Sequence, residues 1–180
     1  MAFISVKYLL IGLILGLVVA CGYVAVRYVM SSKLRTVGEL ESGFDFNVLG
    51  CVTAQNKSKL FRNSYDAYTN EEQVELIAAN VKVLMERQGK QKLFLTGDSA
   101  TERCRDAVEQ IAKSLNEKGL TCTTGASVAY DVDSIHKIAA ADAVVLVEQI
   151  DVSRYDAIKK EKELCAECKI PVLGCVPVIG

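Results

Sequence analysis

The sequence has few of the features that mark common catalytic and nucleic-acid-binding proteins. It contains one histidine and no tryptophan, and Phe and Tyr together make up only 7% of its 180 residues. Aromatic residues this sparse and scattered exclude a stacking surface for bases. A single histidine without a recognisable nucleophile loop also leaves no Ser/His/Asp arrangement to assemble.

Acidic residues are missing from the first part of the chain. The first one is Glu39, whereas four of the 21 Lys and Arg residues lie at or before Arg35. The remainder carries 17 basic and 22 acidic residues, a net charge of −5. Proteins that bind nucleic acid through its phosphates normally have the opposite sign, so this class of partner is excluded.

The cysteines show no disulfide framework. There are seven, an odd number, and their spacing follows no regular pattern. This usage is typical of a reducing compartment and favours a cytoplasmic location for the domain that holds most of them.

A long run without charge lies near the N-terminus. Residues 8–26 contain no charged side chain, and Lys7 and Arg27 bound the run. As a helix this run extends roughly 28 Å, close to the hydrocarbon thickness of a bilayer. The run therefore predicts a transmembrane helix within residues 1–30. Because Arg27, Lys33 and Arg35 follow the run and only Lys7 precedes it, the positive-inside tendency places the C-terminal domain in the cytoplasm of a single-pass cell-membrane protein.

A second interpretation of this run is a lipoprotein signal peptide. A small residue before Cys21, in "VVAC", resembles a lipidation site, and Cys21 would then be the modified N-terminus of an exported protein. The apolar run continues past Cys21, whereas mature lipoproteins open with a polar tether. The uncleaved helix is therefore the favoured alternative.

Helical and strand patterns alternate along the rest of the chain. We expect a linking region over 31–69, with a short helix opened by a Thr36–Glu39 capping box and ended near Gly43, a strand over 46–52 and a polar loop over 53–69. A cytoplasmic domain follows over 70–180. Its predicted helices lie at 70–88, 100–117, 133–140 and 153–168, and its predicted strands at 92–96, 120–124, 142–149 and 170–178. This alternation predicts an α/β domain with a small Rossmann-like parallel sheet.

The turn after the strand at 92–96 is the first place to look for a phosphate site. Ligands in such folds lie at the carboxyl ends of the strands. The turn "TGDSATERC" contains Gly97, Ser99 and Thr101, which are the residues that could contact a phosphate, but it has no Gly-Lys-Ser/Thr. Asp98 would repel a phosphate and is expected to cap the helix instead. We therefore predict no bound nucleotide, no other cofactor and no metal.

Two further motifs carry weaker chemical signals. His136 lies near Asp131 and Asp133, but this spacing matches no common metal signature, and acids suit the start of a helix. Cys165 and Cys168 form a CxxC at the end of a helix, where the dipole raises a thiol pKa rather than lowering it. We expect both thiols to be buried on the inner face of that helix.

The order of these parts resembles the C-terminal part of bacterial polysaccharide co-polymerases, the chain-length determinant family. "SSKLRTVGELESGFDFNVLGCV" is similar to the segment after that family's second transmembrane helix, with Asn47 where proline is usual. "NEEQVELIAANVKVLM", "QKLFLTGDSATERCRDAVEQIAKSLNEKG" and "AAADAVVLVEQIDVSRYDAIKKEKELCAECKIPVLGCVPVIG" are similar to parts of its tyrosine autokinase domain, a P-loop kinase fold.

The departures from this family bear on function. The phosphate-binding lysine, the magnesium-binding aspartates and the tyrosine-rich tail have no counterpart, so no catalytic residue is carried over. The resemblance implies a degenerate kinase-like domain that is not an enzyme but an accessory or scaffold component of capsular or exopolysaccharide synthesis and export. It implies self-association, or docking of a polymerase or a partner kinase. A nucleotide-binding protein with an atypical loop is the enzymatic alternative.

Overall fold

The computed structural model describes residues 2–29, 32–53, 69–97 and 101–180. The chain forms two compact units, residues 1–32 and residues 33–180. They are described separately below.

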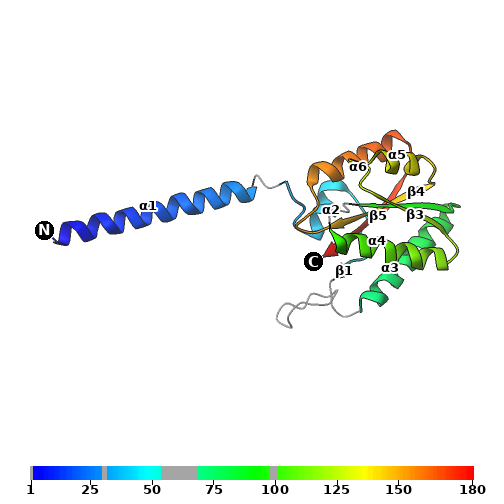
Figure 1. Ribbon diagram of the computed structural model, residues 1–180, viewed down its shortest axis with the longest axis horizontal. Helices are drawn as coiled ribbons and strands as arrows, with labels where there is room; N and C mark the ends of the chain where they lie inside the picture. The colour runs from blue at the N-terminus through cyan, green and yellow to red at the C-terminus, as the bar shows by residue number, and fades with distance from the viewer. Residues whose placement is uncertain (1, 30–31, 54–68, 98–100) are drawn as a thin grey trace. The chain divides into compact units, whose positions relative to one another are not determined.

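The first unit is a single helix, α1 (Ala2–Val29), drawn without interruption in Figure 1. Its Leu, Ile and Val side chains between residues 10 and 26 are all more than half exposed. Across the described part of the chain, we find no helix that combines the length and the apolar character needed to cross a membrane.

The second unit is built on a parallel sheet of five strands in the order β1-β5-β4-β2-β3 (Figure 1). The predicted α/β class and the parallel arrangement are therefore confirmed. The strands are β1 (Val52–Thr53), β2 (Lys92–Gly97), β3 (Thr121–Ala126), β4 (Ala143–Gln149) and β5 (Val172–Ile179). The helices of this unit are α2 (Val37–Phe44), α3 (Asn70–Arg87), α4 (Glu102–Glu117), α5 (Val132–Ala139) and α6 (Tyr155–Glu167).

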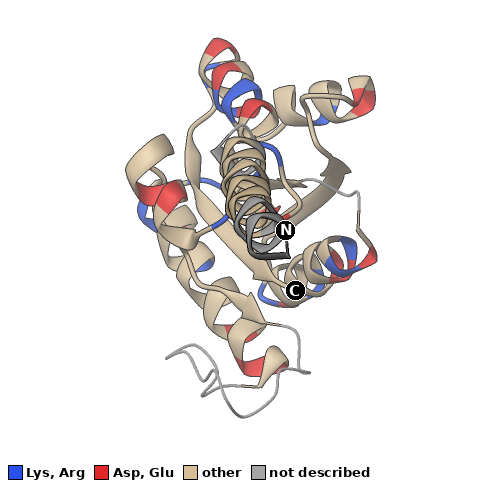
Figure 2. Cartoon of the chain, turned by 90° about the vertical axis from the view of Figure 1, so that its left-hand side faces the viewer, with Lys and Arg blue, Asp and Glu red and all other residues tan. Residues whose placement is uncertain are grey.

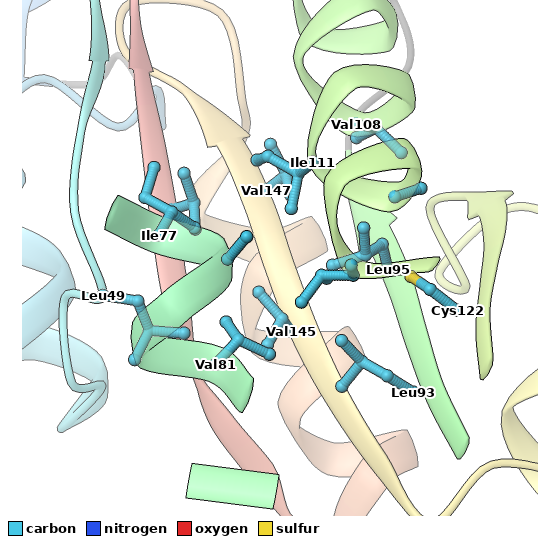
Figure 3. Close-up of a cluster of buried hydrophobic side chains, with 14 of the residues drawn as sticks. Leu49, Ile77, Val81, Leu93, Leu95, Val108, Ile111, Cys122, Val145 and Val147 are labelled. Carbon is cyan, nitrogen blue, oxygen red and sulfur yellow. The ribbon is translucent and has the colours of Figure 1, made fainter. Parts of the chain in front are cut away.

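Helices cover both faces of the sheet. On one face, α3 and α4 pack against strand residues such as Val145 and Val147 (Figure 3). On the other face, α2, α5 and α6 pack against Val144 and Leu146. Every side chain of β4 is buried, as expected for a central parallel strand whose alternate residues enter two separate cores.

The apolar stripes predicted for the two long helices are confirmed. Helical spacing predicts two inward stripes: Val74, Ile77, Ala78, Val81, Leu84 and Met85 in α3, and Cys104, Ala107, Val108, Ile111, Ala112 and Leu115 in α4. All of these side chains are buried except Leu84, which is partly buried. The start of α3 is a capping box in which the Thr69 hydroxyl accepts from the Glu72 amide and the Glu72 carboxylate accepts from the Thr69 amide, at 2.8 Å. The prediction of Asn70 as the cap is one residue too late.

The capping box predicted for α2 does not form. Thr36 is the N-cap, but its side chain makes no capping hydrogen bond, and the Glu39 carboxylate accepts from the Arg35 amide at 3.0 Å instead. The helix also continues past Gly43 to Phe44. It ends at Asp45, whose φ of 58° turns the backbone out of the helix.

The strand predicted over 46–52 is shorter than expected. Val48 forms an isolated bridge with Cys175, and the regular ladder with β5 begins only at Val52. Gly50 lies between the two pairing points with a φ of 152°, and a Cβ on it would lie 2.6 Å from Ile77 of α3. The close approach of α3 thus bends the chain here and interrupts the strand. Of the loop predicted over 53–69, residues 54–68 lie outside the described residues.

Candidate functional site

The strand order creates one point where the chain leaves neighbouring strands in opposite directions. The chain runs from β2 through α4 to β3, which lies on one side of β2. From β4, which lies on the other side of β2, it runs through α6 to β5, farther away in that opposite direction. α4 packs on the first face of the sheet and α5, which leads into β4, on the second. The crevice between the carboxyl ends of β2 and β4 is the position where ligands bind in open parallel sheets. Gly97 and Gln149 end these two strands and define the candidate site.

Two side chains meet at this crevice, at the start of α4. The Thr101 hydroxyl donates a short hydrogen bond to the Gln149 side-chain carbonyl and accepts from the Cys104 amide at 3.3 Å. Gln149 is only 6% exposed. Its backbone amide donates to the Ser153 hydroxyl at 2.9 Å, which holds the end of β4 in place. A side-chain pair therefore lies at the helix N-terminus, where a bound phosphate would otherwise lie.

The backbone of β4 leaves no room for a side chain on Gly97. Gly97 pairs with Val147 in the ladder between β2 and β4. A Cβ on Gly97 would lie 1.8 Å from the carbonyl oxygen of Val147. This glycine permits close contact between two strands, and that contact accounts for its presence without any ligand.

The end of β5 approaches the same crevice. A Cβ on Gly180 would lie 2.8 Å from Gln149 Nε2 and 2.9 Å from Arg103 Nη1. Arg103 is thus directed toward the end of the chain. Its neighbour Arg105 lies on a different part of α4, beside the cavity described next.

A small cavity lies on the other side of β2. Its volume is about 230 Å³, and it is bounded by the first turns of α4 and the ends of β2 and β3. The cavity is lined by Gly97, Cys104, Arg105, Val108, Glu109, Thr124, Gly125 and Ala126. Arg105 and Glu109 bring opposite charges to this lining, so the cavity does not concentrate the positive charge that a polyphosphate needs.

Of the predicted phosphate-contacting residues, the structure describes Gly97 and Thr101. Thr101 caps α4, and Gly97 lies in the sheet. Ser99 and Asp98 lie outside the described residues, so the capping role predicted for Asp98 stays a prediction. Thr101 nevertheless makes the cap hydrogen bond that opens α4.

The residues around His136 have structural roles. The Asp131 carboxylate caps α5 by accepting from the Ser134 amide and hydroxyl, at 3.0 and 2.6 Å, and these bonds lower the Asp131 pKa. Asp133 forms an ion pair with Lys137 at 2.9 Å, and His136 is exposed. Over the described ranges, no group of three or more His, Cys, Asp or Glu side chains is arranged to hold a metal ion.

The CxxC is split between the interior and the surface. Cys165 is buried in α6, and burial, with the nearby Glu161 carboxylate, raises its pKa to about 12. Cys168 is exposed, so the prediction that both thiols are buried is wrong for this residue. The reason is that α6 ends at Glu167 and Cys168 occupies the C-cap, beyond the last turn that packs on the sheet.

The sequence interpretation missed two buried acids behind the candidate site. Glu148 of β4 and Glu161 of α6 are 2% and 1% exposed and belong to the face covered by α6. Burial raises the pKa of Cys175 well above its usual value, and these two carboxylates raise it further. Glu161 shares the helical stripe of Ile158 and Cys165, and this spacing is the signal that could have identified it as buried.

Comparison with known proteins gives structural similarity only. No protein-family model matches the sequence, and no curated protein matches it either. The kinase domain of the Escherichia coli tyrosine kinase ETK aligns over 80% of this chain and 95% of its own, with 9% identity and a TM-score of 0.49. The chimerical protein CapA2B2 aligns over 79% of this chain and 98% of its own, with 16% identity and a TM-score of 0.44. At these values, neither similarity assigns a function to the chain.

Proposed function

We propose that this chain is a membrane-anchored, non-catalytic scaffold in the synthesis and export of a capsular or exopolysaccharide. The family resemblance of the segments at 31–52, 70–85, 91–119 and 139–180 supports the pathway. The absence of a phosphate-binding lysine from the sequence of the β2–α4 turn supports the non-catalytic role. The domain then works through its surfaces, by self-association or by docking a polymerase or a partner kinase.

The observation that carries the non-catalytic part is the hydrogen bond between Thr101 and Gln149 at the start of α4. The Thr101 hydroxyl and the Gln149 amide satisfy each other at the helix N-terminus, and Gln149 is almost completely buried. A nucleotide would have to displace this pair and would meet no ammonium group from the turn. The exchange loses a buried hydrogen bond and gains no charge-assisted one from the turn.

The membrane anchor in this proposal is the uncharged run at residues 8–26. Within α1, the apolar side chains between residues 10 and 26 have no partner in their own unit that would cover them. Exposed apolar area of this extent is costly in water and favourable in lipid. Membrane fractionation of cells, followed by extraction with carbonate and then with detergent, tests this part. Recovery in the carbonate-soluble fraction would contradict it.

Nucleotide binding is tested by thermal unfolding of the full chain in detergent, followed by a thiol-reactive dye. We expect Mg²⁺–ATP at millimolar concentration to leave the midpoint unchanged. A ligand at ten times its Kd stabilises by about 1.4 kcal/mol, which corresponds to roughly 4 °C for a unit of this size. A shift of that size that disappears in Thr101→Val would instead establish the nucleotide-binding alternative.

The pathway is tested by removing the chain from cells and measuring the amount and length distribution of surface polysaccharide. We expect the distribution to change. We also expect Thr101→Val to restore it as well as the unaltered chain does, because no nucleotide chemistry is required. Intact-mass measurement of the purified chain adds a separate test of the anchor. A mass that lacks the first 20 residues and includes acyl groups on Cys21 would establish the lipoprotein alternative.

A further inference from the structure

The outer face of α3 carries apolar side chains that no other element covers within the described part of the chain. Leu76 and Val83 are 50% and 47% exposed, and the exposed Ala79 lies between them. Their spacing places all three on one side of the helix, away from the buried stripe that packs on the sheet. We call this exposed side, from Glu72 to Arg87, the α3 outer face.

Opposite charges lie at the two ends of the α3 outer face. Glu71, Glu72 and Glu75 lie at the N-terminal end and line a surface groove of about 670 Å³ that also includes Leu76, Ala79 and Lys118, whose ammonium group pairs with Glu75 at 3.7 Å. Figure 2 shows this acidic end where α3 meets the grey trace. Lys82 and Lys90 line a second groove, of about 480 Å³, toward the C-terminal end of the helix, near Arg87. This groove also includes Lys118 and Glu86, and Glu86 pairs with Lys82 at 3.7 Å.

The α3 outer face is complementary to a second copy of itself that runs in the opposite direction. Around the midpoint between Ala79 and Asn80, Leu76 and Val83 are equally distant, and so are Glu72 and Arg87. When two α3 helices pack antiparallel across a two-fold axis at this midpoint, each Leu76 opposes a Val83 and each Glu72 opposes an Arg87. In a two-fold contact the same patch serves both subunits, and this face meets that condition.

We infer that the α3 outer face is the contact between two copies of this chain, with their α3 helices antiparallel around a two-fold axis. The net charge of −5 on the chain after Arg35 makes two copies repel at a distance. A contact between two copies is therefore favoured on a surface where acidic side chains of one copy face basic side chains of the other. The α3 outer face is such a surface, because Glu72 opposes Arg87. The inference stands independently of the function proposed above.

The α3 outer face is preorganised for such a contact. The capping box at Thr69 fixes the start of α3, and the buried Ile77, Val81 and Met85 fix its rotation on the sheet. Association then requires little ordering of the backbone, so more of the gain from covering Leu76 and Val83 remains as affinity.

The test is cross-linking of the full chain in detergent with a short bismaleimide. Ala79→Cys, in a Cys21→Ser and Cys168→Ser background, places one reactive thiol next to the proposed axis, because the other native cysteines are buried. We expect cross-linked dimer from this protein. Lys159→Cys in the same background is the control, since Lys159 is 68% exposed on α6 and far from α3 in sequence and on the other face of the sheet.

Two charged variants then test the antiparallel register. Leu76→Lys and Val83→Glu, each added to the Ala79→Cys protein, should both weaken dimerisation at least about tenfold, because each places a charge against an apolar side chain. An equal mixture of the two variants should recover cross-linking. In the mixed pair the introduced ammonium opposes the introduced carboxylate, and the unaltered Leu76 opposes the unaltered Val83. Both substituted sites are exposed, so both variants should keep the unfolding midpoint of the parent.

Three outcomes would overturn the inference. The first is cross-linking of Ala79→Cys no greater than that of Lys159→Cys. The second is undiminished cross-linking in both charged variants. The third is a mixture of folded variants that cross-links no better than either variant alone, which would place a different partner on this face or a different register between the copies.

Discussion

We predict that Gly97→Ala strongly destabilises the domain, because Gly97 is in close contact with the backbone of β4. A Cβ at this position would lie 1.8 Å from the Val147 carbonyl oxygen, 2.8 Å from its carbonyl carbon and 3.2 Å from its Cα. All three atoms belong to the backbone of the central strand, so a rotamer change cannot relieve the clash. β2 and β4 would have to move apart at the carboxyl end of the sheet.

The size of the effect follows from the ladder that this movement disturbs. Inserting one carbon into a well-packed interior costs about 1–3 kcal/mol, and we expect the upper end because backbone atoms obstruct the carbon. For a unit of this size, a loss of about 3 kcal/mol lowers the unfolding midpoint by roughly 10 °C.

The measurement is thermal unfolding of the full chain with a thiol-reactive dye, which responds when the buried cysteines become accessible. Gly38→Ala in α2 is the matched control. It also adds one carbon, but nothing lies within 4 Å of the new Cβ and the position is helical, so the midpoint should stay or rise slightly. A midpoint for Gly97→Ala within 1–2 °C of the unaltered chain, roughly the effect of 0.5 kcal/mol, would refute the close contact between the strands.

Three further predictions concern the cap, acid stability and the thiols. Thr101→Val should destabilise the domain by about 1–2 kcal/mol in urea unfolding, because it removes the α4 cap and the partner of a buried amide; Thr101→Ser should recover most of the loss. The Asp142 carboxylate accepts from two backbone amides at the start of β2, which lowers its pKa, so its contribution is present near neutrality and is lost as the pH falls through the acid range. Asp142→Asn should therefore reduce the fall in urea midpoint between neutral pH and pH of about 3, and an unchanged slope would contradict this role. In native protein, Cys168 should react rapidly with maleimide by mass spectrometry, whereas Cys122, whose pKa is raised to about 12 by burial, should react only on unfolding.

Periodicity in the sequence was sufficient to predict most of the secondary structure of the domain. The stripe from Val74 to Met85 could be identified because every inward position of α3 faces one continuous apolar surface. The run at 142–149 was equally clear as a strand, because β4 is buried on both faces and needs no alternation of polar residues.

Long-range contacts explain most of what the sequence did not predict. The missing cap at Thr36 is a local exception, since the Glu39 amide donates to the Thr36 backbone carbonyl at 3.2 Å instead of to the hydroxyl. The strand over 46–52 was interrupted because α3 approaches Gly50, a contact between segments 27 residues apart in the sequence. The hydrogen bond between Thr101 and Gln149 joins side chains that are 48 residues apart in the sequence. Local sequence patterns cannot reveal such a contact.

The pairing of β1 with β5 has a consequence for how the chain is made. Val52 and Thr53 lie opposite Val178 and Ile179, so the edge of the sheet joins segments separated by more than 120 residues. Until Ile179 has left the ribosome, the segment around Leu49 and Val52 has no neighbouring strand and its apolar side chains stay accessible to chaperones and proteases. The rate of synthesis of the intervening residues therefore sets how long each nascent chain remains vulnerable.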